Sequence, residues 1–104
     1  VAFQPHLFSR TRDHYETFGS VFSNCDELLV CDIYPARELP IEGVTGELIS
    51  KSAQERGHRD ARFVGEKENV LSTLSGTLSE KDLVVLMGAG NITQLGRQLL
   101  ENEF

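Results

Sequence analysis

Apolar residues along this chain fall into short continuous runs separated by longer amphipathic stretches. The runs lie within residues 1–5, 27–34, 61–64 and 82–87, and runs of this length are typical of strands covered on both faces. Between them, as at residues 66–78, apolar positions recur at helical spacing. A strand followed by a helix, four times over, predicts an α/β domain with a mostly parallel sheet of about four strands and helices on both faces.

The first helix is predicted to begin just after the first strand. Ser9 or Thr11 is expected to cap it, because a side-chain oxygen can accept hydrogen bonds from the open amides of the first turn. Asp13 then falls in that turn, where the helix dipole favours a carboxylate. The apolar residues of this helix form one aromatic-rich core stripe, made of Tyr15, Phe18, Val21 and Phe22.

Composition and charge indicate which classes of protein the chain can belong to. The 104 residues suit a single domain, and a net charge of −6 disfavours general binding to nucleic acid or to an acidic membrane surface. No apolar run is long enough to cross a bilayer. Cys25 and Cys31 lie along one element, which is a poor geometry for a disulfide, so we expect two reduced thiols in a cytoplasmic protein. Because the chain opens directly on a strand, we expect it to be a piece of a longer protein.

Polar side chains gather where the first strand ends. A cation in the first turn of a helix opposes the dipole, so Arg10 is interpreted as a ligand-binding group that grips a carboxylate through two hydrogen bonds. His6 can donate to a carboxylate or phosphate, and its alternative role is to cap the neighbouring helix or bond a loop carbonyl. Arg12 is expected to pair with Glu16 one turn along the helix. The sequence therefore predicts an anion-binding corner around His6 and Arg10.

A glycine-rich turn at residues 88–91 follows the fourth predicted strand. In an open parallel sheet, ligands bind at the carboxyl ends of the strands where the winding reverses, and the usual winding would place this turn beside His6. The turn is neither a dinucleotide fingerprint nor a P-loop, and an ordinary strand-to-helix turn capped by Asn91 is the alternative. The residues expected to line the cleft are Gly88, Gly90 and Asn91, together with Tyr34 and Arg37 at the start of the long loop over residues 35–44.

Three segments, taken together, resemble the C-terminal domain of the Mur ligase family. They cover the chain from end to end and read Phe3-Gln4-Pro5-His6-x-Phe8-Ser9-Arg10-Thr11-Arg12, Asp32-Ile33-Tyr34-Pro35-Ala36-x-Glu38-x-Pro40-Ile41-x-Gly43-Val44 and Met87-Gly88-Ala89-Gly90-Asn91-Ile92. The resemblance implies a Rossmann-like three-layer fold over residues 1–104. It also implies that the N-terminal and central domains of a three-domain enzyme are absent from this chain.

The function implied by the resemblance is ATP-dependent amide formation in peptidoglycan synthesis. The carboxylate of UDP-N-acetylmuramate is phosphorylated to an acyl phosphate, which the amine of L-alanine attacks. ATP and Mg²⁺ would be bound mainly by the absent central domain, so no catalytic residue and no metal ligand are assigned here and the isolated domain is expected to be inactive. In the family the His-x-aromatic-Ser-Arg motif holds the alanine carboxylate, which points to His6 and Arg10.

Two positions depart from the family pattern. Leu7 stands where an arginine usually follows the histidine, and Arg37 stands where a glycine is usual. One guanidinium is therefore missing from the corner, and Arg37 is a candidate to replace it. The alternative to a ligase domain is a stand-alone doubly wound module that binds an anionic metabolite.

Overall fold

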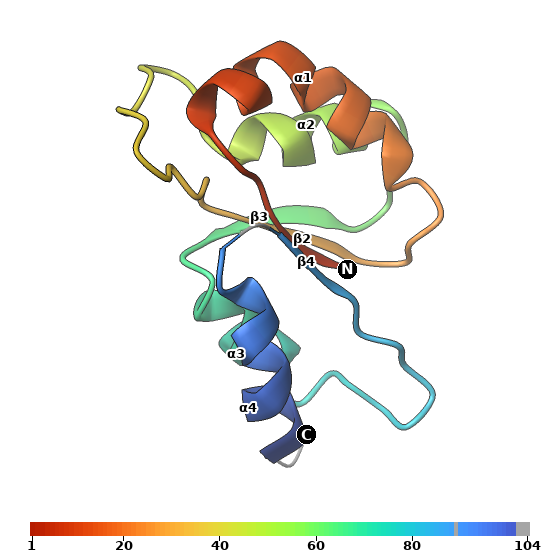
Figure 1. Ribbon diagram of the computed structural model, residues 1–104. Coiled ribbons are helices and arrows are strands. Elements are labelled where there is room, and N and C mark those ends of the chain that lie inside the picture. Colours follow the sequence, from red (N-terminus) through yellow and green to blue (C-terminus); the bar gives the residue numbers. More distant parts are fainter. Residues whose placement is uncertain (89, 102–104) are drawn as a thin grey trace.

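The computed structural model describes residues 1–88 and 90–101 of the chain. Within them, a parallel sheet lies between two layers of helices (Figure 1). The strands are β1 (Ala2–Gln4), β2 (Leu28–Cys31), β3 (Ala61–Gly65) and β4 (Leu86–Gly88). The helices are α1 (Phe8–Val21), α2 (Glu47–Glu55), α3 (Asn69–Leu74) and α4 (Leu95–Glu101), with a short 3-10 helix, η1 (Ile92–Gln94), before α4. The strand order β3-β2-β1-β4 confirms the α/β class and sets the first and fourth strands side by side, as predicted.

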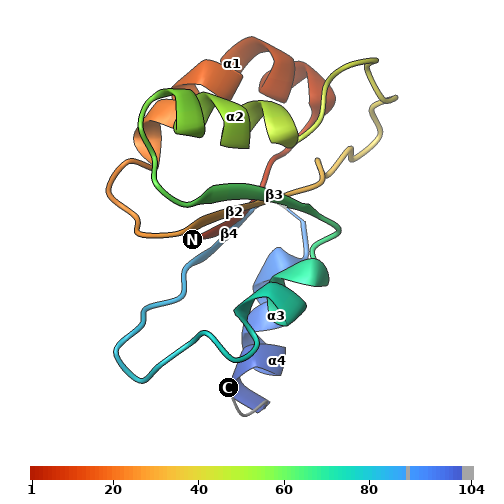
Figure 2. The same cartoon turned by 180° about the vertical axis from the view of Figure 1, so that it is seen from behind.

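The helices divide evenly between the two faces of the sheet. α1 and α2 pack together on one face, and α3 and α4 lie on the other (Figure 2). A Cβ at Gly19 would lie 2.4 Å from the Ser52 Oγ atom, so the absence of a side chain in α1 lets α2 approach closely. The described residues include no helix with the length and apolar character needed to span a membrane.

The centre of the core is β2, which is buried on both faces. Successive strand side chains point to opposite faces, so Leu28 and Val30 pack in the cluster beneath α1 and α2. Leu29 and Cys31 pack in the cluster beneath α3 and α4. Each of these side chains is at most 2% exposed, and full burial of a leucine contributes about 1.5–3 kcal/mol. This double burial explains the continuous apolar run in the sequence.

The start of α1 differs from the prediction. Leu7 is the N-cap residue, and Ser9 and Thr11 lie inside the first turn, where neither side chain caps the helix. The Thr11 hydroxyl instead donates to the Leu7 carbonyl at 3.0 Å. The first turn contains no acidic residue, so Asp13 lies farther along the helix than expected. The Ser9 amide donates instead to Glu38, which is 29 residues away in the sequence.

Two expected elements are shorter than predicted, and one residue of the predicted core stripe is exposed. α3 covers only part of residues 66–78, and β4 starts at Leu86 rather than at residue 82. Leu83 is 87% exposed and precedes Leu86, the first residue of β4 that is in register with β1. Val21 is 60% exposed, since it lies roughly 90° around the helix from the middle of the stripe at 100° per residue. The other three members of the stripe, Tyr15, Phe18 and Phe22, pack in the core as predicted.

Candidate functional site

The carboxyl ends of β1 and β4 meet at one edge of the sheet, which we call the carboxyl edge. Gln4 of β1 is in register with Gly88 of β4. A Cβ at Gly88 would lie 2.9 Å from the Gln4 carbonyl oxygen, so the two backbones approach too closely for a side chain there. This geometry confirms that the glycine-rich turn and the His6 segment begin side by side.

Beyond β1 the chain continues along the segment that follows β2. His6 and Tyr34 form an isolated parallel bridge, and the Leu7 amide donates to the Tyr34 carbonyl at 2.9 Å. The rings of His6 and Tyr34 stack with their centroids 6.0 Å apart. Leu7 has a φ of 69°, which is unfavourable for a residue with a side chain. Tyr34 and His6 are thus held as a pair at the carboxyl edge by a constrained backbone.

Gly90 packs against one member of this pair, Tyr34, and against Gln4. A Cβ at this position would lie 2.9 Å from Cδ2 of Tyr34 and 2.7 Å from Oε1 of Gln4. Only glycine fits between them without displacing one of the two side chains. The Gln4 Oε1 atom is buried and has no hydrogen-bond partner in the part of the chain that the structure describes. Tyr34 and Gly90, both predicted to line the cleft, are therefore in direct proximity.

The amino end of α1 holds a carboxylate from the chain itself. The Ser9 amide donates to Oε1 of Glu38 at 2.9 Å, and the Ser9 hydroxyl donates to Oε2 at 2.5 Å. The hydroxyl hydrogen bond is the main cause of a lowered Glu38 pKa, and the nearby charge of Arg12 acts in the same direction. Glu38 thus takes the place of the predicted side-chain cap and fastens the 35–44 loop to α1.

The two arginines of this turn have different surroundings. Arg10 is exposed, and no carboxylate of the described residues lies within 4.0 Å of its guanidinium. Arg12 binds Asp13 at 2.8 Å, so the predicted pair with Glu16 is wrong. Both Nε and a terminal nitrogen of the Arg12 guanidinium donate to the Asp13 carboxylate. Two hydrogen bonds to one carboxylate hold the guanidinium more firmly than a single contact would. This hydrogen bond also lowers the pKa of Asp13 and leaves Arg10 as the cation available to a ligand.

Comparison with curated proteins identifies the relationship of the chain. It is 45% identical over 101 residues to a protein of Geotalea daltonii, 47% identical over 100 residues to one of Cutibacterium acnes, and 36% identical over 104 residues to one of Xylella fastidiosa. All three are named UDP-N-acetylmuramate–L-alanine ligase, and the matches cover 97%, 96% and 100% of this chain. By sequence, the chain is similar to one segment of these ligases. It spans only about a fifth of their length, between 21% and 22%. No family model matches the chain.

Arg37, one of the two positions that depart from the expected motif, is exposed in the 35–44 loop. The loop begins directly after Tyr34 and is fastened to α1 through Glu38, one residue beyond Arg37. Arg37 therefore belongs to a loop held against the turn that carries Arg10. The described contacts do not join its guanidinium to His6 or to Arg10.

One residue at the carboxyl edge of the sheet was not predicted from the sequence. Lys67 follows β3, and its Nζ atom donates to Oδ1 of Asn91. Asn91 precedes η1 but makes no capping hydrogen bond through its side chain, so the predicted cap is wrong because Lys67 takes the amide oxygen. A signal was present, since Lys67 is the first cation after the third strand and so falls at the edge where the other candidates gather.

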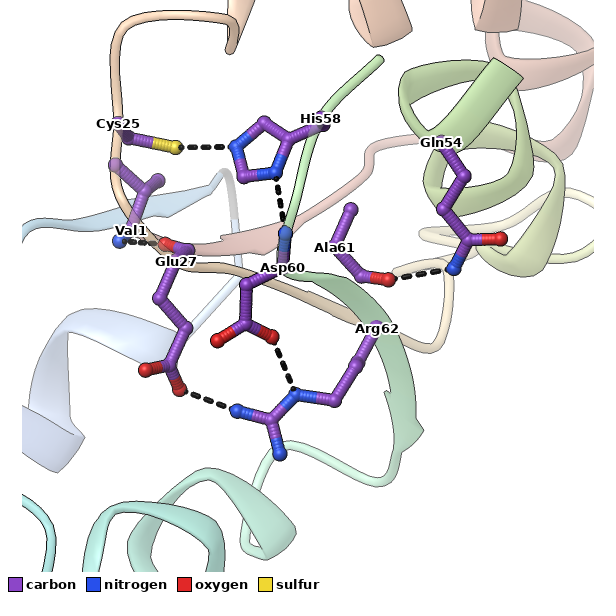
Figure 3. A network of polar contacts seen from close by, with 8 residues as sticks. All are labelled: Val1, Cys25, Glu27, Gln54, His58, Asp60, Ala61 and Arg62. Carbon is purple, nitrogen blue, oxygen red and sulfur yellow. Dashed lines mark hydrogen bonds and ion pairs between the residues drawn. The ribbon is translucent and has the colours of Figure 1, made fainter. Parts of the chain in front are cut away.

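The opposite edge of the sheet, which we call the amino edge, carries a second group of polar residues (Figure 3). Arg62 donates to Glu27 at 2.6 Å and also pairs with Asp60 at 3.1 Å. The Asp60 amide donates to Nδ1 of His58, and Nε2 of that ring lies 3.5 Å from the Cys25 sulfur. A hollow of about 430 Å³ also opens at this edge, lined in part by these strand ends. None of the predicted ligand-binding residues lies there.

The two thiols sit at opposite ends of β2. Both are free cysteines, as predicted. Burial raises the pKa of Cys31 to about 12 and also raises the pKa of Cys25. Among residues 1–88 and 90–101, no three His, Cys, Asp or Glu side chains lie close enough together to hold a metal ion. The donor groups described here therefore do not fit a resident Mg²⁺.

Proposed function

We propose that the chain is the C-terminal domain of a cytoplasmic, ATP-dependent ligase that joins L-alanine to UDP-N-acetylmuramate for peptidoglycan synthesis. The observation that carries the proposal is the 36–47% identity, over nearly the whole chain, to proteins with that name. The chain spans about a fifth of those proteins, which fits one domain of a larger enzyme.

The proposed role of this domain is to close over the active site and orient the carboxylate of the amino acid. Arg10 supports this role because its guanidinium is exposed and not neutralised by a carboxylate of the described residues. A guanidinium and an imidazole can hold a carboxylate through charge-assisted hydrogen bonds. His6 is kept in place by its bridge and ring contact with Tyr34. Holding the amine close to an activated carboxyl group accelerates the reaction by positioning alone.

ATP and Mg²⁺ belong, in this proposal, to the remainder of the enzyme. The described residues offer no cluster of metal-binding side chains, and the glycine-rich turn lacks the lysine of a P-loop. When ATP is bound, it would activate the carboxylate of UDP-N-acetylmuramate by phosphorylation. The 104-residue chain alone is therefore expected to catalyse no ligation, and ATP-dependent ligation by it would contradict the proposal.

The decisive experiment replaces the two proposed ligands in the full-length ligase. Arg10→Ala and His6→Ala are each expected to raise the KM for alanine by about 10- to 100-fold, the equivalent of a lost hydrogen bond to a charged group. Thermal unfolding should change little for Arg10→Ala, because the side chain is exposed. Arg12→Ala is the matched control, since Arg12 lies in the same turn but is paired with Asp13. An unchanged KM for alanine in both variants would refute the assignment.

The same assay tests whether Arg37 replaces the guanidinium that is missing at Leu7. Arg37→Ala is expected to raise the KM for alanine while leaving the KM for ATP unchanged. The exposed position of Arg37 in a loop fastened to α1 supports this part of the proposal. An unchanged KM for alanine would remove Arg37 from the site without affecting His6 or Arg10.

A further inference from the structure

Lys67 and Asn91 meet across the carboxyl edge of the sheet. They are 24 residues apart in the sequence, and they follow β3 and β4, which are the two outer strands. Neighbouring strands lie about 4.8 Å apart, so three spacings separate these outer strands by roughly 14 Å. The turn after β3 and the side chain of Lys67 must therefore extend over the ends of the inner strands to reach Asn91. This contact spans the place where the winding of the sheet reverses.

The chemistry of the two side chains determines how the amide of Asn91 is oriented. A lysine ammonium has only donors, so it can bind the amide oxygen but not the amide nitrogen. With its oxygen bound to Lys67, Asn91 keeps both of its N–H donors for another acceptor. Asn91 is exposed, so an acceptor outside the chain can reach these donors. Contact with a cation also polarises the amide and strengthens the remaining donors.

The charge of Lys67 is only weakly compensated. Its side chain is 22% exposed, and its partner at hydrogen-bond distance is the neutral amide of Asn91. Among the described residues, the carboxylate paired with it is that of Glu68, whose Oε1 lies 3.9 Å away, beyond hydrogen-bond distance. A largely buried cation is favourable only when an anion or several acceptors compensate it. An external anion near Asn91 would supply that compensation.

We propose that Lys67 and Asn91 together bind an oxyanion, a carboxylate or phosphoryl group of a substrate, between the carboxyl ends of β1 and β4. Lys67 acts as a positioning residue that turns the N–H donors of Asn91 towards the ligand and adds positive charge behind them. Arg10 lies on α1, whereas Lys67 and Asn91 lead into α3 and η1 on the other face of the sheet. The pair therefore extends the site to that face. The inference rests on the proposed function, which supplies substrates with carboxylate and phosphate groups.

The test uses the full-length ligase and measures the KM for alanine, ATP and UDP-N-acetylmuramate separately. Asn91→Asp keeps an acceptor for Lys67 but removes both N–H donors and adds a negative charge. It is expected to raise one of the three KM values by about tenfold or more, with a smaller change in kcat. Lys67→Met is expected to raise the same KM, and Lys67→Arg should restore most of the affinity. Lys81→Met, at an exposed lysine near the amino edge, is the matched control.

The substrate whose KM rises identifies the oxyanion, so the three measurements distinguish an alanine carboxylate from a phosphoryl group. The proposal is overturned if Asn91→Asp and Lys67→Met leave all three KM values within about twofold of the wild type, a change well below one lost hydrogen bond to a charged group. That result, together with a raised KM for alanine in Arg10→Ala, would leave the proposed function standing. If Lys67→Met fails to fold, Asn91→Asp decides the question, because it preserves the contact with Lys67.

Discussion

The two edges of the sheet differ in how far their charged side chains are paired with one another. At the amino edge, Arg62 is bound by Glu27 and Asp60, and His58 accepts a hydrogen bond from the Asp60 amide (Figure 3). At the carboxyl edge, Arg10 is exposed without a carboxylate of the described residues within 4.0 Å. Polar groups that satisfy one another stabilise the fold, whereas groups left over are available to a ligand. In the proposed function, Arg62 therefore stabilises the fold through its ion pairs, whereas Arg10 is available to a ligand.

Backbone conformation shows the same difference. The described residues with a side chain and a positive φ are Leu7 and Ala36, and both follow strands at the carboxyl edge. At the amino edge, the positive φ of 95° before β3 falls on Gly57, which adopts it without strain. Unfavourable backbone conformations persist where the surrounding structure imposes them, and they are concentrated at functional sites. The carboxyl edge thus carries both the unpaired cation and the strained turn.

The largest effect among the following predictions is expected for Gly90→Ala in the full-length protein, assayed for the proposed ligation. The new Cβ would lie 2.7 Å from Gln4 Oε1 and 2.9 Å from Tyr34 Cδ2, so at least one of these two side chains must shift. We expect kcat/KM to fall by about tenfold, in line with the cost of overpacking. Gly96→Ala is the control, because its Cβ would meet Leu86 at 3.4 Å within a helix. Equal losses in the two variants would show that Gly90 has no special role at the edge.

A smaller effect is expected for Arg62→Met at the amino edge. It removes two ion pairs of a half-exposed arginine, so the free energy of unfolding of the 104-residue chain should fall by about 0.5–1 kcal/mol. Urea unfolding at low and high salt measures this, and the difference from wild type should shrink in high salt because ions screen the pairs. The KM for alanine of the full-length ligase should be unchanged. A rise in the KM for alanine comparable to that of Arg10→Ala would show that the amino edge also contributes to substrate binding.

The smallest effect is expected for Glu38→Gln and is confined to a pH range. The folded-state pKa of Glu38 is lowered from the usual 4.5, so its ionised form stabilises the fold above that value and this contribution is lost as the pH falls through the folded pKa. The wild type should therefore be more stable than Glu38→Gln at neutral pH, and the difference should shrink below about pH 4.5. Thermal unfolding from pH 7 to pH 3 measures this. Glu42→Gln, in the same loop, is the control variant.

The features that sequence could predict are those set by local pattern. The run Leu28–Cys31 reads as a doubly buried strand and is one, and the order of the elements was enough to place the first strand beside the fourth. The features missed depend on distant partners. The acceptor at the start of α1 comes from Glu38, and the partner of Asn91 is Lys67. Neither contact leaves a trace in helical or strand periodicity, because each joins residues that are far apart in the chain.

The strand order also has a consequence for how the domain forms. β1 is an inner strand of the sheet and the first of the four described strands along the chain, yet one of its neighbours is β4, the last of them, where Ala2 pairs with Leu86. Parallel pairing across so long a chain closes late, because a large loop must be ordered before the contact forms. Until then one side of β1 presents unpaired backbone groups to other chains. Premature termination before β4 would leave that side open permanently, so truncated products of this chain should aggregate more readily than the full chain.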